Sequence, residues 1–381
     1  MKRMFNRLFI FSVCLVLSTN SLLAGNEDRA GEAGGYELLM NGWARSSGMY
    51  GMNSSRVEGL EAMRINVAGL AHAPNTEVVF SHSRWLFDSQ VSINAAGIAQ
   101  AIGKEKTNFI GLNINSVSFG DIEITTTNSP EGGLGTYSPN FLNIGLAFSR
   151  AFSESIYGGV VVRFLNQRVP DLSASGVALD AGIQYVTGKL DQIRFGVSLR
   201  NVGTPMKFGG EGLTFRGDAP SGSYNLTVSS RTQKFELPSL LHIGASYDLY
   251  ADNLKNNPDL AADHRITIAF NFTSNSFGKD HVGGGLEYSY REMFQVRAGY
   301  RYEKGLTDAE TRTTDFVGIA AGASVMVPFK EEGPAMGIDY SYRPSQVFGG
   351  THSIGLRFNL GTKVPPFKKK KSKEEVFQEE G

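Results

Sequence analysis

The sequence predicts a transmembrane antiparallel β-barrel of about fourteen strands with an N-terminal plug. Apolar and polar residues alternate along many segments, the chain opens like an exported protein, and glycine and aromatic residues are abundant. The clearest alternation covers residues 351–360. Because successive side chains of a strand point to opposite faces, one face of this segment is apolar and the other is polar. The apolar face carries Ile354, Leu356, Phe358 and Leu360.

Segments with this two-residue period, each bounded by turn residues, recur along the chain and mark the candidate strands. Their number, about fourteen, is even, as a single-chain bacterial barrel requires for both ends of the sheet to lie on one side of the membrane. The candidate strands are residues 77–86, 90–101, 107–119, 140–151, 155–166, 174–187, 192–202, 239–249, 264–273, 281–290, 293–303, 315–328, 336–343 and 351–360.

The connections between these segments alternate in length, which favours a membrane barrel over a soluble sandwich. Short connections are expected on the periplasmic side, at residues 103–106, near 152, and at 188–191, 291–292 and 329–335. Long connections are expected on the outer side, at residues 120–139, 167–173, 203–238 and 304–314. Two connections depart from the pattern: residues 250–263 are long for a periplasmic turn, and 87–89 are short for an outer loop.

Residues 1–24 have the features of a secretory signal peptide, with basic residues, the apolar run 8–17 and a Leu-Leu-Ala cleavage site. The apolar run is too short for a membrane-spanning helix. Cys14, the only cysteine, lies in this run, and Val13 before it is bulkier than a lipoprotein anchor site needs. The mature chain therefore has no thiol for disulfides, zinc or catalysis. An exported barrel is expected in the bacterial outer membrane.

No catalytic constellation is present, so the sequence predicts neither an enzyme nor a cofactor or metal site. The six histidines are scattered and none forms an H-E-x-x-H motif. The glycine cluster at residues 132–135 lacks the Gly-Lys-Ser/Thr of a phosphate loop. Lys and Arg together number 37, as do Asp and Glu, so the net charge does not predict a nucleic-acid partner.

The chain divides into four parts: the signal peptide (1–24), an N-terminal plug (25–75), the barrel (76–360) and a charged periplasmic tail (361–381). A barrel of this size encloses a lumen too wide for its own side chains, which residues 25–75 would fill. The alternative for this segment is a disordered periplasmic leader. The lysine-rich tail would contact an anionic surface or a periplasmic partner, or would be a disordered end without specific contacts.

Charged residues of both signs fall on the predicted inward faces of the strands. Inside a lumen, such charges are expected to pair with one another and with the plug; the alternative is a polar route or a docking surface for anionic groups. These residues are Arg194, Arg200, Arg265, Arg291, Arg297, Arg301, Arg343 and Arg357, with Asp180, Asp248, Glu287 and Asp339.

Two N-terminal segments, residues 43–53 and 66–71, resemble the hatch of the PorV/PorQ family, a branch of the FadL-like barrels of Bacteroidota. In that family a Gly/Ala/Met-rich run precedes an Asn-Pro-Ala-Gly-Leu-Ala segment. Here Val67 stands in place of the proline, which would otherwise impose a rigid turn. The hatch residues that match are Arg45, Gly48, Met49, Gly51, Asn66, Ala68 and Gly69.

Residues 193–208 are similar to a strand of that family that ends in an Asn-x-Gly turn, here Asn201 and Gly203. The last strand also resembles the terminal signal that barrel-assembly machinery reads, with Gly355, Phe358 and Leu360 at the matching positions. Together the resemblance covers nearly the whole mature chain up to Leu360.

The resemblance implies a role in type IX protein secretion. Such a barrel would bind components of the translocon, or secreted proteins through their C-terminal signal domain, for delivery to the cell surface. The alternative is a FadL-like transporter of small hydrophobic molecules, in which Gly283–Gly285 would loosen a strand for a lateral opening. A third interpretation is a factor that modifies lipid A or lipopolysaccharide. All three would contact outer-membrane lipid.

Overall fold

The barrel is closed and antiparallel. A computed structural model describes residues 25–218, 225–250, 263–329 and 333–361. Within these ranges fourteen strands form one ring, in which β1 pairs with β18 to close the sheet. The predicted antiparallel barrel of about fourteen strands is therefore confirmed. The predicted signal peptide, and all but the first residue of the predicted tail, lie outside the described residues.

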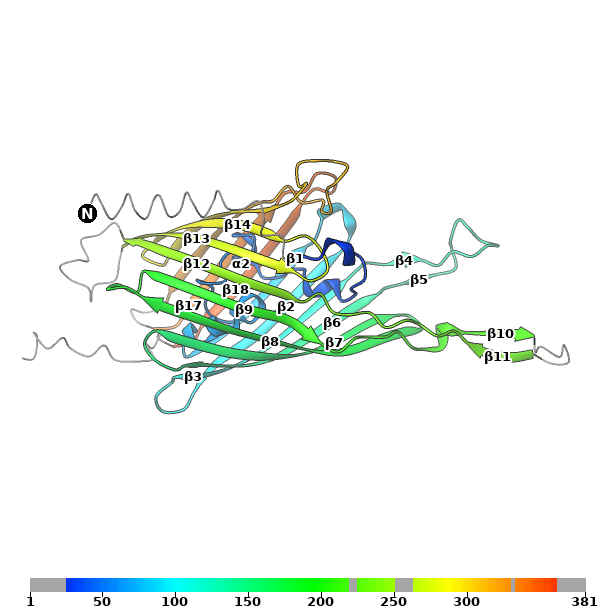
Figure 1. Ribbon diagram of the computed structural model, residues 1–381, viewed down its shortest axis with the longest axis horizontal. Helices are drawn as coiled ribbons and strands as arrows, with labels where there is room; N and C mark the ends of the chain where they lie inside the picture. Colours follow the sequence, from blue (N-terminus) through cyan, green and yellow to red (C-terminus); the bar gives the residue numbers. More distant parts are fainter. Residues whose placement is uncertain (1–24, 219–224, 251–262, 330–332, 362–381) are drawn as a thin grey trace, which may run out of the picture.

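The barrel strands run obliquely to the long axis of the molecule (Figure 1). They range from 9 residues in β1 to 16 in β8, which suffices to cross a bilayer at a tilt. Their bounds are β1 Thr76–Arg84, β2 Ser92–Ile102, β3 Asn108–Ser118, β6 Asn140–Ala151, β7 Ile156–Val169, β8 Leu172–Thr187, β9 Ile193–Gly203, β12 Leu240–Tyr250, β13 His264–Asn275, β14 His281–Tyr290, β15 Phe294–Glu303, β16 Ile319–Pro328, β17 Ala335–Arg343 and β18 Thr351–Asn359.

Burial along the strands follows the predicted alternation. In β18 the outward-facing Ile354 is 52% exposed, whereas the inward-facing Ser353 and Arg357 are 1% and 6% exposed. The same period repeats in β15, where Phe294 and every second residue after it up to Tyr300 are exposed. The outer face thus presents apolar side chains to lipid, and the inner face buries polar ones in the lumen.

Two of the long connections carry hairpins that project from one end of the barrel (Figure 1). The first pairs β4 (Ile122–Glu123) with β5 (Thr136–Tyr137), and the second pairs β10 (Thr214–Asp218) with β11 (Asn225–Ser229). The short helix η6 (Glu211–Leu213) precedes the second hairpin. This is the loop end of the barrel; β1 begins and β18 finishes at the opposite end.

One predicted loop is wrong. Residues 167–173 were expected to form a long outer connection, but β7 and β8 continue through most of this range and pair up to Val169 and Leu172. Only Pro170 and Asp171 remain as the turn. The outward-facing Arg168 and Ser173 are exposed on strand ends that extend past the apolar band, whereas Gln167 is buried on the lumenal face.

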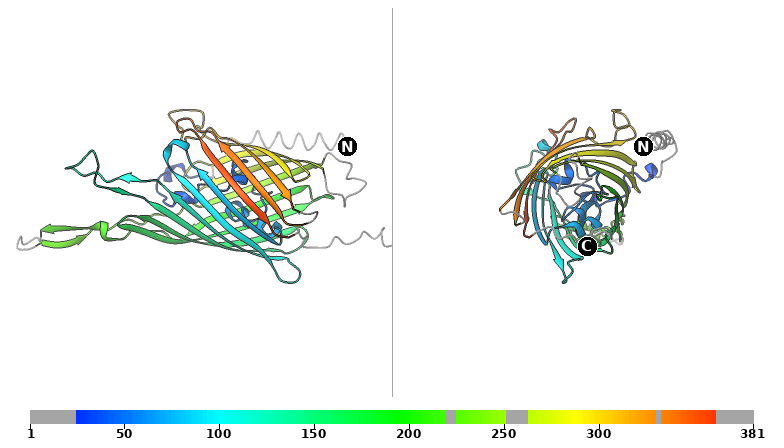
Figure 2. Two further views of the ribbon diagram at one scale, coloured as in Figure 1. Left: turned by 180° about the vertical axis from the view of Figure 1, so that it is seen from behind. Right: turned by 90° about the vertical axis from the view of Figure 1, so that its left-hand side faces the viewer.

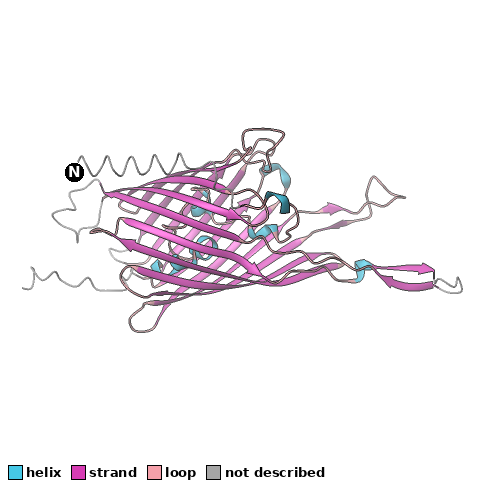
Figure 3. Ribbon diagram, viewed as in Figure 1, coloured by secondary structure: helices cyan, strands magenta, loops and turns pink. Residues whose placement is uncertain are grey.

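Residues 33–73, here called the lumenal segment, lie inside the ring of strands (Figure 2). Short helices make up much of it (Figure 3). The helices before β1 are η2 (Glu27–Arg29), η3 (Tyr36–Leu38), α2 (Ala44–Ser47), α3 (Ala62–Ile65) and η4 (Val67–His72), and η5 (Phe87–Ser89) follows β1. Among the described residues, no helix is long and apolar enough to span a membrane.

Candidate functional site

Barrel side chains hold the backbone of the lumenal segment in place. The Glu77 carboxylate of β1 accepts a hydrogen bond from the Leu60 backbone N–H at 2.6 Å. The Gln184 amide of β8 donates to the backbone oxygen of Val57 at 3.1 Å. These bonds satisfy backbone groups that are buried away from water, which would otherwise be costly.

Four of the predicted hatch residues lie in and directly after α2. Arg45 lines a small internal space together with carboxylates of the segment and of β14. A Cβ added to Gly48 would stand 3.0 Å from the backbone of β16, which is closer than most Cβ contacts, so glycine favours this close approach. Met49 packs on Gly299 of β15, and Gly51 adopts a left-handed φ of 72°.

Asn66 caps a short helix at the position where the family's proline is replaced by Val67. Its side-chain oxygen accepts a hydrogen bond from the Ala68 backbone N–H at 3.2 Å and caps η4, which begins at Val67. Its amide nitrogen donates to a backbone oxygen of β8, that of Ile183, at 3.1 Å. Gly69 follows in η4, where a Cβ would stand 2.0 Å from a backbone oxygen. The chain therefore turns into η4 without a proline.

The predicted Asn-x-Gly turn is a β-bulge instead. The pairing of β8 with β9 shifts register between Leu179 and Ala181, and Asn201 opposite this shift has a left-handed φ of 59°. The Asn201 backbone N–H donates to the Asp180 carboxylate at 2.7 Å. The chain remains in the strand as far as Gly203. The asparagine thus tolerates the unusual backbone geometry within β9 rather than reversing the chain.

The terminal-strand residues lie at the seam where the barrel closes. Gly355 pairs with β1, and a Cβ there would contact Ala44 of α2 at 3.3 Å. Phe358 pairs with Val78 of β1, and the Leu360 backbone N–H donates to the oxygen of Thr76 at 2.8 Å. The position of these residues at the seam is that of a terminal strand. Recognition of this strand by barrel-assembly machinery stays a prediction.

Most of the predicted inward-facing charges pair in the lumen, as expected. The Glu287 carboxylate accepts from Arg265 and from Arg297, each at 3.0 Å. The lumenal segment joins this network, because its Arg56 pairs with Asp248 of β12 at 3.1 Å. Other pairs include Arg357–Asp339, Arg163–Asp180 and Arg194–Glu58.

Arg291 was expected in the lumen, and that prediction is wrong. Arg291 follows the last residue of β14, and the left-handed φ values of Arg291 and Glu292, 53° and 54°, reverse the chain there. Its side chain is exposed and pairs with Asp263 at 2.7 Å. Conversely, the buried Arg163 is inward-facing but absent from the predicted set. Its alternation with apolar neighbours in β7 is the signal that marks it.

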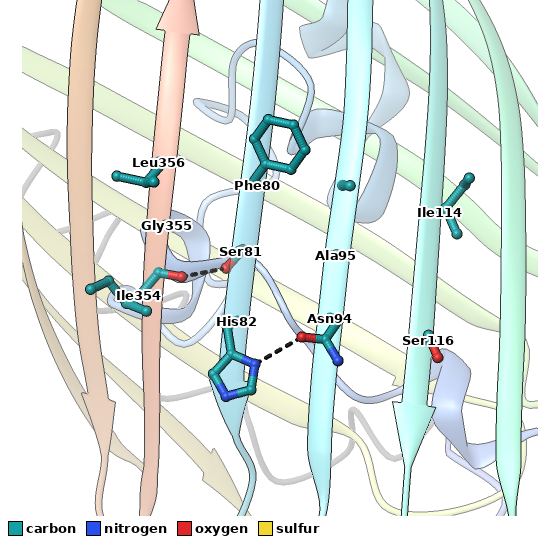
Figure 4. A pocket seen from close by; sticks show the side chains of 11 residues that line it. Phe80, Ser81, His82, Asn94, Ala95, Ile114, Ser116, Ile354, Gly355 and Leu356 are labelled. Carbon is teal, nitrogen blue, oxygen red and sulfur yellow. Dashed lines mark hydrogen bonds between the residues drawn. The ribbon is translucent and has the colours of Figure 1, made fainter.

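A groove of about 450 Å³ crosses the outer wall over β18, β1, β2 and β3 (Figure 4). Phe80, Ile114 and Leu356 form apolar sides, and the small Ala96 leaves the space between them. At the end of the groove nearer the loops the lining turns polar, with His82 hydrogen-bonded to an amide oxygen of β2 at 2.8 Å. The groove therefore presents apolar surface to lipid and ends in hydrogen-bonding groups.

A buried apolar cluster lies across the same wall, on the lumenal side. Leu60, Met63 and Leu70 of the lumenal segment pack there with small side chains of β2 and aliphatic ones of other strands. Glycines thin the wall: a Cβ on Gly97 of β2 would stand 2.9 Å from Leu60, and one on Gly111 of β3 would stand 2.7 Å from Met63. Apolar surface thus meets the wall from both sides.

Gly283–Gly285 do not loosen the barrel wall. The pairing of β14 with β13 and with β15 is continuous through these residues. A Cβ on Gly283 would stand 2.9 Å from Met52, and one on Gly285 would stand 2.6 Å from Met49. Gly283 and Gly285 make room for methionines of the lumenal segment, so the prediction of a lateral opening at β14 is not supported.

The described residues hold no cluster of histidine and acidic side chains suited to a metal ion. The buried carboxylate of Glu37 accepts hydrogen bonds from the Gln167 amide at 2.8 and 3.0 Å. Burial raises the pKa of Glu37, and these hydrogen bonds oppose that shift. Glu37 therefore joins the segment to β7 without an ion pair.

Solved structures with the same fold are outer-membrane barrels. The toluene transporter TbuX of Ralstonia pickettii is 12% identical, with a TM-score of 0.51 over 84% of this chain and 98% of its own. The toluene transporter TodX of Pseudomonas putida is also 12% identical, with a TM-score of 0.50 over 84% and 97%. No protein-family model and no curated protein matches the sequence. The fold places the chain in the bacterial outer membrane, and the narrower PorV/PorQ assignment stays a prediction.

Proposed function

We propose that this chain is a non-enzymatic transporter that moves small hydrophobic molecules through the outer membrane, with residues 25–75 as its plug. The observation that carries the proposal is the apolar groove on the lipid-facing wall, which lies across the sheet from the buried apolar cluster. TbuX and TodX, which share the fold, are toluene transporters. The lumenal segment would hold the solute at this cluster before it reaches the lipid.

The physical basis is the removal of apolar surface from water, worth roughly 25 cal/mol per Å². An apolar solute would first leave water at the buried cluster, which is stabilising, and its surface would stay away from water in the groove. Between the two lie Ala95 and Gly97 of β2 and the backbone of its neighbours. Because β2 is hydrogen-bonded continuously to β1 and β3, passage requires these strands to part locally.

Filling the groove is expected to slow transport. Ala96→Phe places a ring where Ala96 now leaves space between Phe80 and Ile114. Uptake of radiolabelled toluene by cells that express the variant should fall at least about fivefold. Ala298→Phe is the matched control, because Ala298 is also an outward-facing alanine, on β15. Equal uptake by Ala96→Phe, Ala298→Phe and the parent chain would show that the groove is not the route.

Type IX secretion remains a second candidate, favoured by the β10–β11 hairpin. This hairpin projects beyond the barrel (Figure 1) and exposes apolar side chains away from lipid: Phe215 is 53% exposed and Leu226 is 40% exposed. Exposed apolar residues on a projecting loop suit contact with another protein. The partners would be the translocon or secreted cargo.

Deleting residues 210–231 tests that candidate. The deletion removes the hairpin and leaves the strands of the barrel, so the protein should still shift in mobility on heating in gel electrophoresis. If the chain serves secretion, affinity purification from native membranes should recover proteins sharing one C-terminal domain with the parent chain and not with the deletion variant. Recovery of the same proteins by both would exclude docking on the hairpin.

A further inference from the structure

A second cavity, of about 120 Å³, lies inside the barrel at its loop end, between the lumenal segment and the strands. Its lining includes Asn41 and Tyr50 from the segment and Asn275 from β13. The cavity is distinct from the groove on the outer wall. Its basic side chains are four arginines and two histidines: Arg64, Arg200, Arg301, Arg343, His242 and His281.

Few carboxylates lie near these basic side chains. Among the described residues, Glu303 is the only acidic side chain within 4 Å of any of them, at 3.3 Å from His281 and 3.8 Å from Arg301. Arg200 and Arg343 are each 5% exposed, and neither forms an ion pair with a described residue. A buried charge without a partner is costly, so these two guanidinium groups need an explanation.

Both guanidinium groups also keep hydrogen-bonding capacity unused. The Nε atoms of Arg200 and Arg343 are buried without a hydrogen-bond partner. Arg343 donates to the backbone oxygen of Asn41 at 3.5 Å, and Arg200 donates to that of Leu38 at 3.5 Å and contacts His242 at 3.3 Å. The hydroxyl of Tyr50, which also lines the cavity, has no partner either.

Aromatic rings, rather than carboxylates, hold Arg343 in position. Its guanidinium carbon lies 4.6 Å from the ring centre of Trp85, 5.1 Å from that of Phe316 and 5.7 Å from that of Tyr50. Arg301 lies 4.5 Å from the Tyr50 ring. The face of an aromatic ring attracts the positive charge of a guanidinium group. The ring does not accept hydrogen bonds from the N–H groups, which point outward in the guanidinium plane. The edge of Arg343 therefore stays available to a ligand.

The other lumenal charges show that this arrangement is local. The network around Glu287, and the pairs of Arg56 and Arg357, match each arginine with at least one carboxylate. Among the described residues, the buried arginines that lack a paired carboxylate lie at the loop end. The missing negative charge at that end is the feature a bound anion would supply.

We propose that this cavity binds a compact oxyanion, such as phosphate, sulfate or a short carboxylate, through the arginines Arg200 and Arg343 that line it. Oxyanions accept several charge-assisted hydrogen bonds, which suits the free N–H groups and the Tyr50 hydroxyl. The volume is too small for a drug-sized or chain-bearing ligand. Anion binding here is a property separate from the proposed transport of apolar molecules. Its test does not depend on whether the groove on the outer wall is a transport route.

The test is calorimetric titration of the purified full-length barrel, in an uncharged detergent, with inorganic phosphate, sulfate, acetate and octanoate at constant ionic strength. At least one compact anion should bind saturably. Arg200→Gln and Arg343→Gln should each weaken that binding at least about tenfold, because each removes charge-assisted hydrogen bonds. Arg291→Gln is the matched control, since it removes one arginine from an exposed turn.

Each outcome decides the proposal. Heat-dependent gel mobility identifies variants that are folded, and the two glutamine variants should remain folded because no described carboxylate loses its partner. The proposal is overturned if no compact anion binds, or if both variants bind like the parent. It is also overturned if octanoate binds more than about tenfold tighter than acetate, since the site would then recognise the head of an amphiphile.

Discussion

Replacing Glu287 by alanine is expected to destabilise the folded barrel by about 3–5 kcal/mol, the usual effect of removing one partner from a buried ion pair. Glu287 is 5% exposed and accepts from both Arg265 and Arg297, so its loss leaves the Arg297 side chain without a carboxylate within 4 Å among the described residues. Urea unfolding in detergent, followed by heat-dependent gel mobility, measures the change.

The control is Asp263→Ala. Asp263 forms an ion pair with Arg291 at 2.7 Å as well, but both side chains are about half exposed in a turn outside the lumen. Exposed pairs contribute little because water screens them. This variant should unfold at the urea concentration of the parent. Equal stability of Glu287→Ala and Asp263→Ala would contradict the view that the lumenal network is a buried, coupled set of charges.

Replacing Gly299 by valine is expected to displace the lumenal segment and open the barrel to ions. A Cβ at Gly299 would stand 2.4 Å from the backbone of Met49, far inside the contact distance. Overpacking of this kind costs about 1–3 kcal/mol, and the segment can relieve it by moving while the hydrogen-bonded barrel cannot. Planar-bilayer recordings should show higher conductance than for the parent chain, and a protease should cleave the segment faster.

Gly217→Val serves as the control for this substitution. Gly217 lies in the β10–β11 hairpin, and a Cβ there would have no heavy atom closer than 3.6 Å. Conductance and cleavage should therefore match those of the parent. If Gly299→Val also leaves both unchanged, the segment does not occlude the lumen at this point, and its role as a plug fails.

Local periodicity was enough to predict the barrel. Which face of a strand a residue occupies depends only on whether its position is odd or even, so the alternation in residues 351–360 and its counterparts predicted the strands and their number. Boundaries were less predictable. The outward-facing Arg168 and Ser173 are polar because β7 and β8 extend past the apolar band, and polar residues at a strand end resemble a loop.

In the candidate site, too, some residues could be predicted from the sequence and others could not. The hatch residues were recognisable as a motif, but the contacts of Gly48, Met49 and Asn66 join them to strands more than 100 residues away in the sequence. The groove was not predicted, because its lining comes from β18 and from β1–β3, which meet only when the ring closes. Nothing in the local pattern of any one strand marks it.

The sequence by itself thus determined the fold class, the export of the chain and the polar character of the lumen, since each depends on composition or on neighbouring residues. Only the tertiary structure decided which lumenal charges are paired. Arg343 and Arg357 occupy equivalent alternating positions on adjacent connected strands, yet one lies among aromatic rings and the other against Asp339. The reason is that pairing depends on strand register and on the fold of the lumenal segment, which bring together side chains far apart along the chain.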